Sequence, residues 1–367
     1  MDQMVDEAIF GDFYKGRRVF ITGHTGFKGS WLTYALYKAG AIIKGYSLAP
    51  HTNPSLYSLI EKTAKVQSII ADINDSLRIE KEILSFEPDF IFHLAAQSLV
   101  RKSYKEPLNT FSTNVMGTAN VLNALGKLEK PCTVVLITTD KVYENKEWFY
   151  SYRETDRLGG YDPYSASKAC AELVINSYRQ SYFNPLKFDS HKKAIASARA
   201  GNVIGGGDWA EDRLIPDIVR SLAEHKNITV RNPKAVRPWQ HVLEPIFGYL
   251  HLGALLFKDP LTYYGAWNFG PADGSSLPVL AIVQQATNIW GRGDIDLQLN
   301  PKSLHEAGLL KLDISKATNE LGWKPRMNTD EAVKRTINWY KLFYEQTSAA
   351  AALLDADILY YQSLLNK

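Results

Sequence analysis

The chain has 367 residues, of which 45% are hydrophobic and 22% are charged, enough to bury a large core in two lobes. Its net charge is +3 and its basic residues are scattered, which argues against a nucleic-acid or membrane-surface partner. Apolar runs stay shorter than a membrane span, residues 1–7 lack the apolar core of a signal peptide, and there are only two cysteines, so we expect a reduced, cytoplasmic protein.

The first predicted element is a short apolar strand that ends at Thr22 and runs into a glycine-rich loop. Gly23 and Gly26 allow a tight turn and the close approach of a ligand to the backbone. Gly29 allows the helix predicted at residues 30–38 to pack against the strand. The helix N-terminus offers free N–H groups and a positive dipole end to a pyrophosphate. The junction therefore predicts a nucleotide site, although glycines at this spacing also occur in plain turns.

Strands and helices alternate over the rest of the first half. Further strands are predicted at residues 41–46, 66–71, 90–94, 133–137 and 195–198, and helices at residues 77–86, 114–125 and 166–182. Apolar strands that alternate with helices are typical of a parallel sheet covered on both faces. We therefore predict an α/β fold with a doubly wound, Rossmann-like parallel sheet, whose ligands bind beyond the carboxyl ends of the strands.

After residue 200 the pattern loosens into connections rich in Gly, Pro and Trp. We predict a cofactor domain over residues 12–200 and a smaller, discontinuous substrate lobe over residues 201–345, which returns in part to the cofactor domain. Helices are predicted at residues 330–343 and 349–365. The terminal segment 346–367 has no assigned role, because both a packed helix and a subunit contact fit it.

The chemistry is predicted at Tyr164 and Lys168, which lie one helical turn apart on the same face. A nearby cation favours the phenolate and lowers the tyrosine pKa from about 10, so Tyr164 could remove a hydroxyl proton as hydride leaves the same carbon. Tyr34 and Lys38 have the same spacing, but their helix follows the glycine loop, where a core or solvent role is expected. The helix of Tyr164 instead follows the strand at 133–137, whose end faces the predicted ligand.

Thr138, Thr139, Asp140 and Lys141 directly follow that strand. An exposed Asp–Lys pair in a loop is usually a solvated ion pair of little energetic consequence. At the ligand edge of the sheet, however, a carboxyl and an amine could divide general acid and base duties on one sugar. Lys141 would need a pKa lowered by burial to act as the base. Which of the two is the acid and which is the base stays open.

At these residues the chain resembles the nucleotide-sugar 4,6-dehydratases of the extended short-chain dehydrogenase/reductase family. The matching segments are residues 22–32, 93–97, 140–141, 160–164, 199–209, 237–242 and 321–323, within an overall resemblance over residues 12–345. Relatives that act on dTDP- or GDP-sugars carry Asp-Glu where this chain has Asp140 and Lys141, so the lysine marks the CDP-sugar branch. Tyr150-Ser151 replaces an expected Trp-Gly, and Val142 replaces a frequent cysteine, which leaves room for a shifted substrate.

The resemblance implies an internal redox cycle in deoxysugar biosynthesis, with CDP-glucose as the substrate and a retained NAD as the cofactor. Tyr164, aided by Lys168 and Thr139, would take the proton of the C4 hydroxyl while the C4 hydride goes to NAD⁺. Asp140 and Lys141 would then remove the C5 proton and protonate the departing C6 hydroxyl. Hydride returns to C6, and the product is CDP-4-dehydro-6-deoxy-D-glucose.

The residues and the resemblance together assign the binding positions. The cofactor set is Gly23, His24, Thr25, Gly26, Phe27, Lys28, Gly29, Asp72, Ile73, Leu94, Ala95, Ala96, Gln97, Asn114, Thr138, Tyr164 and Lys168. The substrate set is Gln97, Asn202, Arg213, Leu214 and Arg237. A planar guanidinium suits a diphosphate, but surface salt bridges are the competing interpretation of Arg213 and Arg237. A helix cap is the competing interpretation of Asp72.

The choice of NAD rests on the family. The second predicted strand ends at Tyr46 and Ser47 with neither a carboxylate for the ribose 2′-hydroxyl nor an arginine for a 2′-phosphate. We therefore expect a weak grip on the ribose, with His24 assisting at the pyrophosphate. His93 is expected to be a core residue, and the dispersed histidines and distant cysteines predict no metal site.

Two other classes of function stay open. An epimerase or decarboxylase of the same superfamily, or a dehydratase acting on a different nucleotide sugar, would also need Tyr164 and Lys168. A non-catalytic cofactor sensor would be expected to lack that pair, which is present. The nucleotide base stays open, and so does the choice between a homodimer and a homotetramer.

Overall fold

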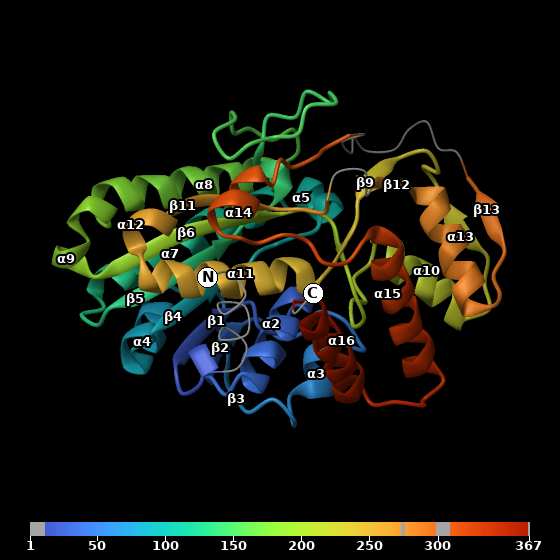
Figure 1. Ribbon diagram of the computed structural model, residues 1–367, viewed down its shortest axis with the longest axis horizontal. Coiled ribbons are helices and arrows are strands. Elements are labelled where there is room, and N and C mark those ends of the chain that lie inside the picture. Colours follow the sequence, from blue (N-terminus) through green and yellow to red (C-terminus); the bar gives the residue numbers. More distant parts are fainter. Residues whose placement is uncertain (1–11, 273–275, 299–308, 366–367) are drawn as a thin grey trace.

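A seven-stranded parallel sheet forms the centre of the protein. The computed structural model describes residues 12–272, 276–298 and 309–365, so the opening segment of residues 1–7 lies outside it. In the described chain the sheet order is β11-β6-β5-β4-β1-β2-β3, and all neighbours are parallel (Figure 1). The sheet strands are β1 (Arg18–Thr22), β2 (Ile42–Ser47), β3 (Val66–Ile70), β4 (Phe90–His93), β5 (Cys132–Ile137), β6 (Lys193–Ala200) and β11 (Gly265–Phe269). This confirms the predicted Rossmann-like α/β fold.

Helices cover both faces of the sheet. Successive strand residues point to opposite faces, so each apolar strand contributes side chains to two cores. Ile21 and Phe92 pack in one core with residues of α2 and α11, whereas Phe20 and Ile91 pack in a second core with residues of α4, α7 and α8. The helices are α2 (Phe27–Lys38), α3 (Leu56–Ile60), α4 (Ser76–Phe86), α5 (Val100–Lys105), α6 (Pro107–Phe111), α7 (Gly117–Lys127), α8 (Pro163–Ser181), α9 (Phe188–His191), α10 (Leu214–Ala223), α11 (Leu243–Lys258), α12 (Pro260–Tyr263), α13 (Val279–Trp290), α14 (Ser315–Glu320), α15 (Thr329–Tyr344) and α16 (Ala350–Leu365).

The structure departs from the predicted elements in several places, two of which concern the central sheet and a helix that covers it. The helix predicted from Asn114 begins as a π-helical turn, η2 (Ser112–Met116), before α7. The edge strand β11 was not predicted, because the segment is short and begins at Gly265. Burial of Trp267 and Phe269 beside β6 stabilises it as a strand.

A smaller group of elements lies beside the sheet and its helices (Figure 1). It contains α10, α13 and α15, which contact one another, and three two-stranded sheets. The strands of these sheets are β7 (Val203–Ile204) with β10 (Gln240–His241), β8 (Ile228–Val230) with β13 (Ile295–Leu297), and β9 (Val236–Pro238) with β12 (Ser276–Pro278). Along the chain between β10 and β12, α11 and α12 pack against the large sheet and β11 forms its edge strand.

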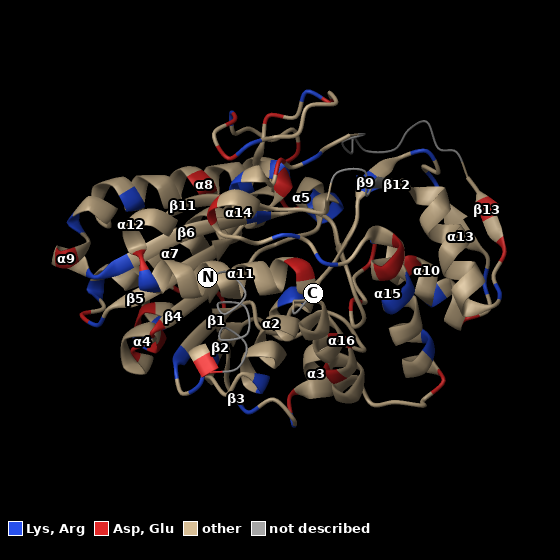
Figure 2. Ribbon diagram, viewed as in Figure 1, with Lys and Arg blue, Asp and Glu red and all other residues tan. Residues whose placement is uncertain are grey.

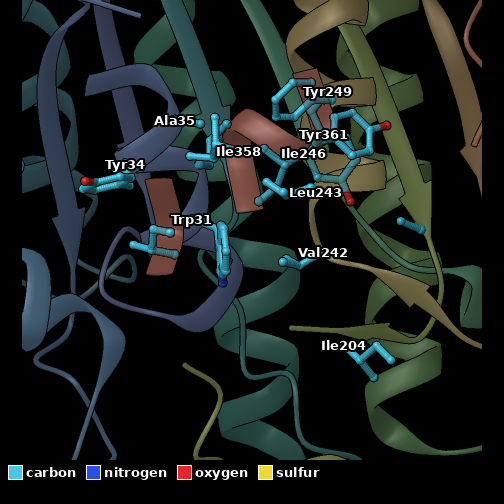
Figure 3. Packing of buried hydrophobic residues seen from close by; sticks show 14 of the residues in the cluster. Trp31, Tyr34, Ala35, Ile204, Val242, Leu243, Ile246, Tyr249, Ile358 and Tyr361 are labelled. Atoms are coloured by element: carbon cyan, nitrogen blue, oxygen red, sulfur yellow. The ribbon is translucent and has the colours of Figure 1, made fainter. Parts of the chain in front are cut away.

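The C-terminal helix α16 is packed into the core. Ile358 and Tyr361 lie near Ala35 of α2 and Ile246 of α11 (Figure 3). The Tyr361 hydroxyl donates to Oε2 of Glu244 at 2.7 Å, so the helix is anchored by a buried polar contact as well as by apolar packing.

Charged residues of both signs are mixed along the described part of the chain. Lys, Arg, Asp and Glu are interspersed along the helices and loops in the view of Figure 2. In the described ranges, none of the helices has the length and hydropathy required to cross a membrane. Over the same ranges, no group of three or more His, Cys, Asp or Glu side chains could hold a metal ion.

Candidate active site

The loop between β1 and α2 has the geometry of an anion-binding turn. Gly23 has φ of +76°, and a Cβ there would lie 2.7 Å from the backbone nitrogen of Ala95. A Cβ at Gly29 would collide with the carbonyl oxygen of Gly23. Gly26 caps α2 without a side-chain hydrogen bond, and the first turn carries no acidic residue. The free N–H groups and the positive helix end therefore fit a pyrophosphate, which supports a dinucleotide at this loop.

His24 of this loop is directed into the core. Its side chain is fully buried, Nε2 lies 2.8 Å from Oγ of Ser68, and the ring packs on the backbone of Gly45 and against Tyr57. Burial lowers the pKa of His24 to about 4, so the ring is neutral at pH 7. The prediction that His24 assists at the pyrophosphate is therefore wrong for its side chain, since packing against β2 leaves the ring no exposed surface.

The other loop residues and the end of β4 lie at the same edge of the sheet. Thr25 donates a hydrogen bond from Oγ1 to the carbonyl oxygen of Leu48 at 2.8 Å, and its Oγ1 also lies 2.8 Å from Oγ of Ser47. These contacts fix the loop that follows β2. Phe27 begins α2, and both it and residues 94–96 after β4 are half-buried. Their position relative to the glycine turn agrees with the predicted cofactor set.

Gln97 and Asn114 join the β4 loop to the helix of Tyr164. Asn114 accepts from the backbone nitrogen of Gln97 at 2.8 Å and lies 2.8 Å from Oγ of Ser167, its Nδ2 being the donor. The Gln97 amide donates to Thr110 at 2.9 Å and accepts from the backbone of Leu99 at 2.7 Å. Both ends of the Gln97 side chain are thus engaged within the protein, and these contacts favour a structural role over the predicted substrate contact.

Asp72 and Ile73 follow β3 at the edge formed by the carboxyl ends of the strands. Asp72 is exposed and accepts a hydrogen bond from the backbone nitrogen of Asn74 at 2.9 Å. The cap of α4 is Asp75, not Asp72, so the helix-cap interpretation of Asp72 is wrong. Ile73 is buried in the core with α7.

Tyr164 lies in the first turn of α8 beside the segment that follows β5. The Thr139 hydroxyl is near its phenol and acts to lower the pKa of Tyr164, and Thr139 donates to Oδ1 of Asp140 at 2.9 Å. Asp140 is only 3% exposed and approaches Gly201 so closely that a Cβ there would lie 2.6 Å from Oδ2. Burial raises the pKa of Tyr164 to about 12 and outweighs the lowering by Thr139 and Arg213, a direction opposite to the predicted one.

Lys168 completes this group, which we call the Tyr164 cluster (Thr139, Asp140, Tyr164 and Lys168). Its Nζ donates to the carbonyl oxygen of Ile137, the last residue of β5, at 3.2 Å. Burial lowers the pKa of Lys168 to about 8, and the charge of Glu172 opposes that shift. Thr138 does not face the cluster, because its hydroxyl donates to Oε1 of Glu172 at 2.5 Å. The structure therefore brings together four of the five predicted catalytic side chains.

Lys141, the fifth, stands next to Asp140 in the 3-10 turn η3 (Asp140–Val142). Its backbone nitrogen donates to Oγ1 of Thr139 at 3.4 Å, and its side chain is half-buried. In the described ranges its amine forms neither an ion pair nor a side-chain hydrogen bond. The amine is thus free to engage a ligand at this edge of the sheet.

Lys28 and Arg213 bring two more cations to the Tyr164 cluster. Lys28, in the first turn of α2, has Nζ 3.5 Å from the hydroxyl of Tyr249. Burial, followed by repulsion from Arg213 and Lys168, lowers the pKa of Lys28 to about 8, while the Asp140 charge opposes the shift. Arg213 donates to Oδ2 of Asp208 at 2.8 Å and to Ser98 at 3.2 Å. Arg213 therefore forms the salt bridge of the competing interpretation. Its charge also acts to lower the pKa of Tyr164.

The remaining substrate candidates lie on the segments between the sheet and the smaller group of elements. Asn202 is half-buried between β6 and β7, and Leu214 is the first residue of α10. Arg237 lies in β9 and donates to the carbonyl oxygen of Val236 at 3.1 Å. Their contact with a substrate stays a prediction.

Sequence reasoning missed two partners of the cluster. Tyr249 reaches it from α11, and burial together with the charges of Tyr164 and Asp140 raises its pKa. Glu172 lies on α8 four residues after Lys168, a spacing that already places the two side chains on one helix face. The position of Tyr249 had no comparable signal, because only tertiary packing brings α11 to this edge.

Comparisons with known proteins agree with this fold. Residues 20–252 match the family described as GDP-mannose 4,6 dehydratase. The chain is 48% identical to a CDP-glucose 4,6-dehydratase of Salmonella typhimurium over 90% of this chain and 92% of that one. It is 23% identical to a UDP-glucose 4-epimerase of Mycoplasma genitalium over 89% and 97% of the two chains. A dTDP-glucose 4,6-dehydratase from Streptomyces venezuelae, solved with NAD bound, has a similar fold, with a TM-score of 0.74, 24% identity and coverage of 88% and 97%.

Proposed function

The chain belongs to the GDP-mannose 4,6 dehydratase family within the extended short-chain dehydrogenase/reductases, and from that premise we propose that it dehydrates CDP-D-glucose to CDP-4-dehydro-6-deoxy-D-glucose. The observation that carries the proposal is the buried carboxylate of Asp140 beside the phenol of Tyr164. A simple hydride exchange needs one proton-transfer group at the sugar, whereas elimination of water needs a second acid–base group. Asp140, with Lys141 next to it, supplies that group.

The cofactor of the proposed reaction is NAD, held at the glycine turn. The uncapped first turn of α2 and the collision that any Cβ would cause at Gly23 fit a pyrophosphate lying against the backbone. Residues 94–97 and Asp72 border the same edge from β4 and β3. When bound, NAD⁺ would accept the hydride of C4 and later return it to C6, so that the net reaction is the loss of water.

Tyr164 is the proposed base at the C4 hydroxyl. Its pKa is about 12 in the structure, and it must fall before a phenolate forms near neutral pH. The Lys168 cation, one turn along α8, and the Thr139 hydroxyl both favour the phenolate. Tyr164 would hold the C4 proton during the oxidised stage, and Lys168 would orient the group without leaving its bond to Ile137.

Asp140 and Lys141 are the proposed pair for the elimination. Once C4 is a ketone, the C5 proton is acidic, and one member of the pair removes it. The other member protonates the C6 hydroxyl, which leaves as water. When hydride returns to C6, the member that took the C5 proton gives a proton back to C5, which completes the 4-dehydro-6-deoxy sugar. Both are adjacent in η3, so the two proton transfers come from one short and partly buried turn.

The test is the mass of the product formed from CDP-glucose with added NAD⁺. Loss of the mass of one water supports the proposal. An unchanged mass with an inverted C4 centre would mean a 4-epimerase, and no conversion with apoprotein confirmed and NAD⁺ supplied would reject both. Repeating the assay across UDP-, dTDP-, GDP- and CDP-glucose identifies the base. We expect the CDP-sugar to have the highest kcat/KM.

The absence of a carboxylate near the end of β2 gives an independent test of cofactor use. Ser47 at that position bonds to Thr25, and exposed Leu48 follows it. With no acidic group for the ribose, we expect protein freshly purified without NAD⁺ to be activated when NAD⁺ is added. A protein shown to be free of cofactor that gains no activity would contradict the cofactor assignment.

A further inference from the structure

A second buried charge lies on α8, one turn beyond Lys168, and has no part in the proposed chemistry. The side chain of Glu172 is only 4% exposed. Its carboxylate accepts hydrogen bonds from Thr138 at 2.5 Å and from Ser197 at 2.9 Å, and it pairs with Arg199 at 2.8 Å. Thr138 directly follows β5, and the other two donors lie in β6. The carboxylate therefore ties the catalytic helix to the two strands next to it.

Arg199 is the counter-charge that makes this burial tolerable. It is also 4% exposed, and its second amino group donates to the Tyr143 hydroxyl at 2.9 Å and to the carbonyl oxygen of Glu154 at 3.0 Å. Although burial favours the uncharged forms of both groups, their pairing lowers the pKa of Glu172 and raises that of Arg199. A buried ion pair is often no more stabilising than apolar side chains of equal volume. Stability alone therefore does not explain these charges.

The group next to this pair is Lys168. Residues four apart on a helix share a face, and Lys168 bonds to Ile137 at 3.2 Å while Glu172 bonds to the next residue, Thr138, so both charged groups lie at the same end of β5. Of the other groups near Lys168, Lys28 from α2 is a like charge, and His93 from β4 is neutral, because burial lowers its pKa to about 3. The Glu172 charge raises the pKa of Lys168 against the larger effect of burial.

Lys168 also lies close to the end of β5 and to the turn that follows it. Tyr164 lies one turn earlier on α8, Asp140 lies in η3, and the carbonyl oxygen of Ile137 in β5 accepts from the amine at 3.2 Å. Asp140 is in contact with Thr139 and Gly201 and faces the proposed substrate. Along α8, Tyr164 lies one turn before Lys168 and Glu172 lies one turn after it, so Glu172 is on the far side of Lys168 from Tyr164.

We propose that Glu172 is a positioning residue of this active site: its carboxylate, held by Thr138, Ser197 and Arg199, keeps the Lys168 amine protonated beside Tyr164. The part of this inference that concerns turnover rests on the proposed function, whereas the part that concerns the charge of Lys168 does not. A cation at position 168 favours the Tyr164 phenolate, so the effect of Glu172 reaches the substrate through two other side chains.

The direct test is the titration of Lys168 by NMR in protein labelled with ¹³Cε-lysine. The Lys168 signal is assigned by its disappearance in Lys168→Arg. In Glu172→Gln we expect the pKa of Lys168 to fall by at least about one unit, a tenfold change in the ratio of charged to neutral amine. The matched control is Ser197→Ala, which removes a hydrogen bond to Glu172 and keeps its charge, and in which we expect the parent titration. Glu172→Asp retains the carboxylate, so the pKa of Lys168 in that variant should stay close to the parent value.

If Glu172→Gln does not fold, a second variant still tests the proposal. The double substitution Glu172→Gln with Arg199→Gln removes both charges and leaves two amides that can bond to each other. Because removal of the Arg199 cation offsets part of the effect, we expect a downward shift of the Lys168 pKa that is smaller than in Glu172→Gln. A folded variant of either kind with an unchanged Lys168 titration would overturn the proposal. A lower melting temperature with no change in titration would show a structural role only.

The turnover measurement separates this inference from the proposed function. In folded Glu172→Gln, the alkaline limb of kcat for CDP-glucose dehydration should move to lower pH by the same amount as the Lys168 titration. An unmoved alkaline limb alongside a shifted titration would refute the link to catalysis. If the parent protein fails to dehydrate any nucleotide sugar while Lys168 still responds to Glu172, the proposed function falls and the electrostatic assignment stands.

Discussion

Two tyrosine–lysine pairs with the same spacing lie in different surroundings in this protein. In α8, the phenol of Tyr164 meets Thr139, and the Lys168 amine donates to the carbonyl oxygen of a strand residue at 3.2 Å. In α2, the phenol of Tyr34 lies 3.1 Å from Oδ1 of Asp355, and Lys38 forms a 3.1 Å ion pair with the same carboxylate. The pair in α8 lies at the edge of the sheet where a ligand is expected, and the pair in α2 bonds to α16.

The difference shows what a helical spacing can predict. It predicts that two side chains share a face, but the element opposite that face determines their chemistry. Tyr164 lies in the first turn of α8, beside the carboxyl ends of β5 and β6, whereas Tyr34 lies in the middle of α2. The structural role expected for Tyr34 and Lys38 is confirmed by their bonds to α16.

The strongest test of the difference between the two pairs is to remove the hydroxyl of each tyrosine in a separate variant. Tyr164→Phe should lower the rate of CDP-glucose dehydration by about 10³-fold, because general base catalysis contributes about 10² to 10⁴. Tyr34→Phe, the matched control, should retain nearly the parent rate. Product mass as a function of time measures both. Equal losses in the two folded variants would mean that position at the sheet edge does not determine the role.

The next largest effect is expected at Lys141. Lys141→Met should lower water loss by about 10²-fold, because one of two proton-transfer groups is removed, yet C4 oxidation needs only Tyr164 and Lys168. A stoichiometric rise in absorbance at the reduced-nicotinamide band, without product, is the expected observation. Lys146→Met is the control, since that exposed lysine pairs with Glu144 of its own loop. Full turnover by Lys141→Met would end the assignment of an elimination pair.

The central fold was predictable because its strands are continuous apolar runs between amphipathic helices. The exception, β11, starts at a glycine with φ of +105° and includes the polar Asn268, so it is not a continuous apolar run. Nothing in such a segment distinguishes a strand from a turn until β6 offers it an edge. The π-helical turn before α7 was also not predictable, because Asn114 is held by Gln97 and Ser167 from other parts of the chain.

The site was predictable where chemistry follows a strand directly, as at Asp140, and where two groups share a helix, as at Tyr164 and Lys168. The prediction for the His24 side chain failed because a motif places a residue on a loop without giving the direction of its ring. The pKa of Tyr164 was predicted in the wrong direction for a related reason. The sequence indicates a neighbouring cation but not the degree of burial, which is the larger effect.

A smaller effect is expected on the free energy of unfolding, which should respond differently to substitution of Lys168 and of Lys38. The pKa of Lys168 is about 8 in the folded state, against about 10.4 in an unfolded chain. Between these values the unfolded chain binds more protons, so the stability of the parent rises with pH from about 8 to 10.4, and below about pH 8 the full cost of burying the cation remains. Lys168→Met should therefore raise the free energy of unfolding at pH 7 by about 1–3 kcal/mol, and by less at pH 10.

Urea unfolding at the two pH values measures this difference. Lys38→Met should change the free energy of unfolding by less than about 1 kcal/mol, because its ion pair with Asp355 is solvent-exposed. A pH-independent effect of Lys168→Met would contradict a buried, titrating amine.

The smallest expected effect concerns the phenols and the C-terminal helix. Tyr34 is buried, and its hydroxyl lies 3.2 Å from the carbonyl oxygen of Ala351 and 3.1 Å from Asp355, both in α16. Tyr34→Phe should lower the free energy of unfolding by about 1 kcal/mol, the usual net contribution of a hydrogen bond. In Tyr164→Phe the lost partner is the Thr139 hydroxyl, which still bonds to Asp140, so stability should change less. Urea unfolding of both variants at pH 7 tests this, and a larger loss in Tyr164→Phe would mean that the phenol of α8, and not that of α2, is the structural one.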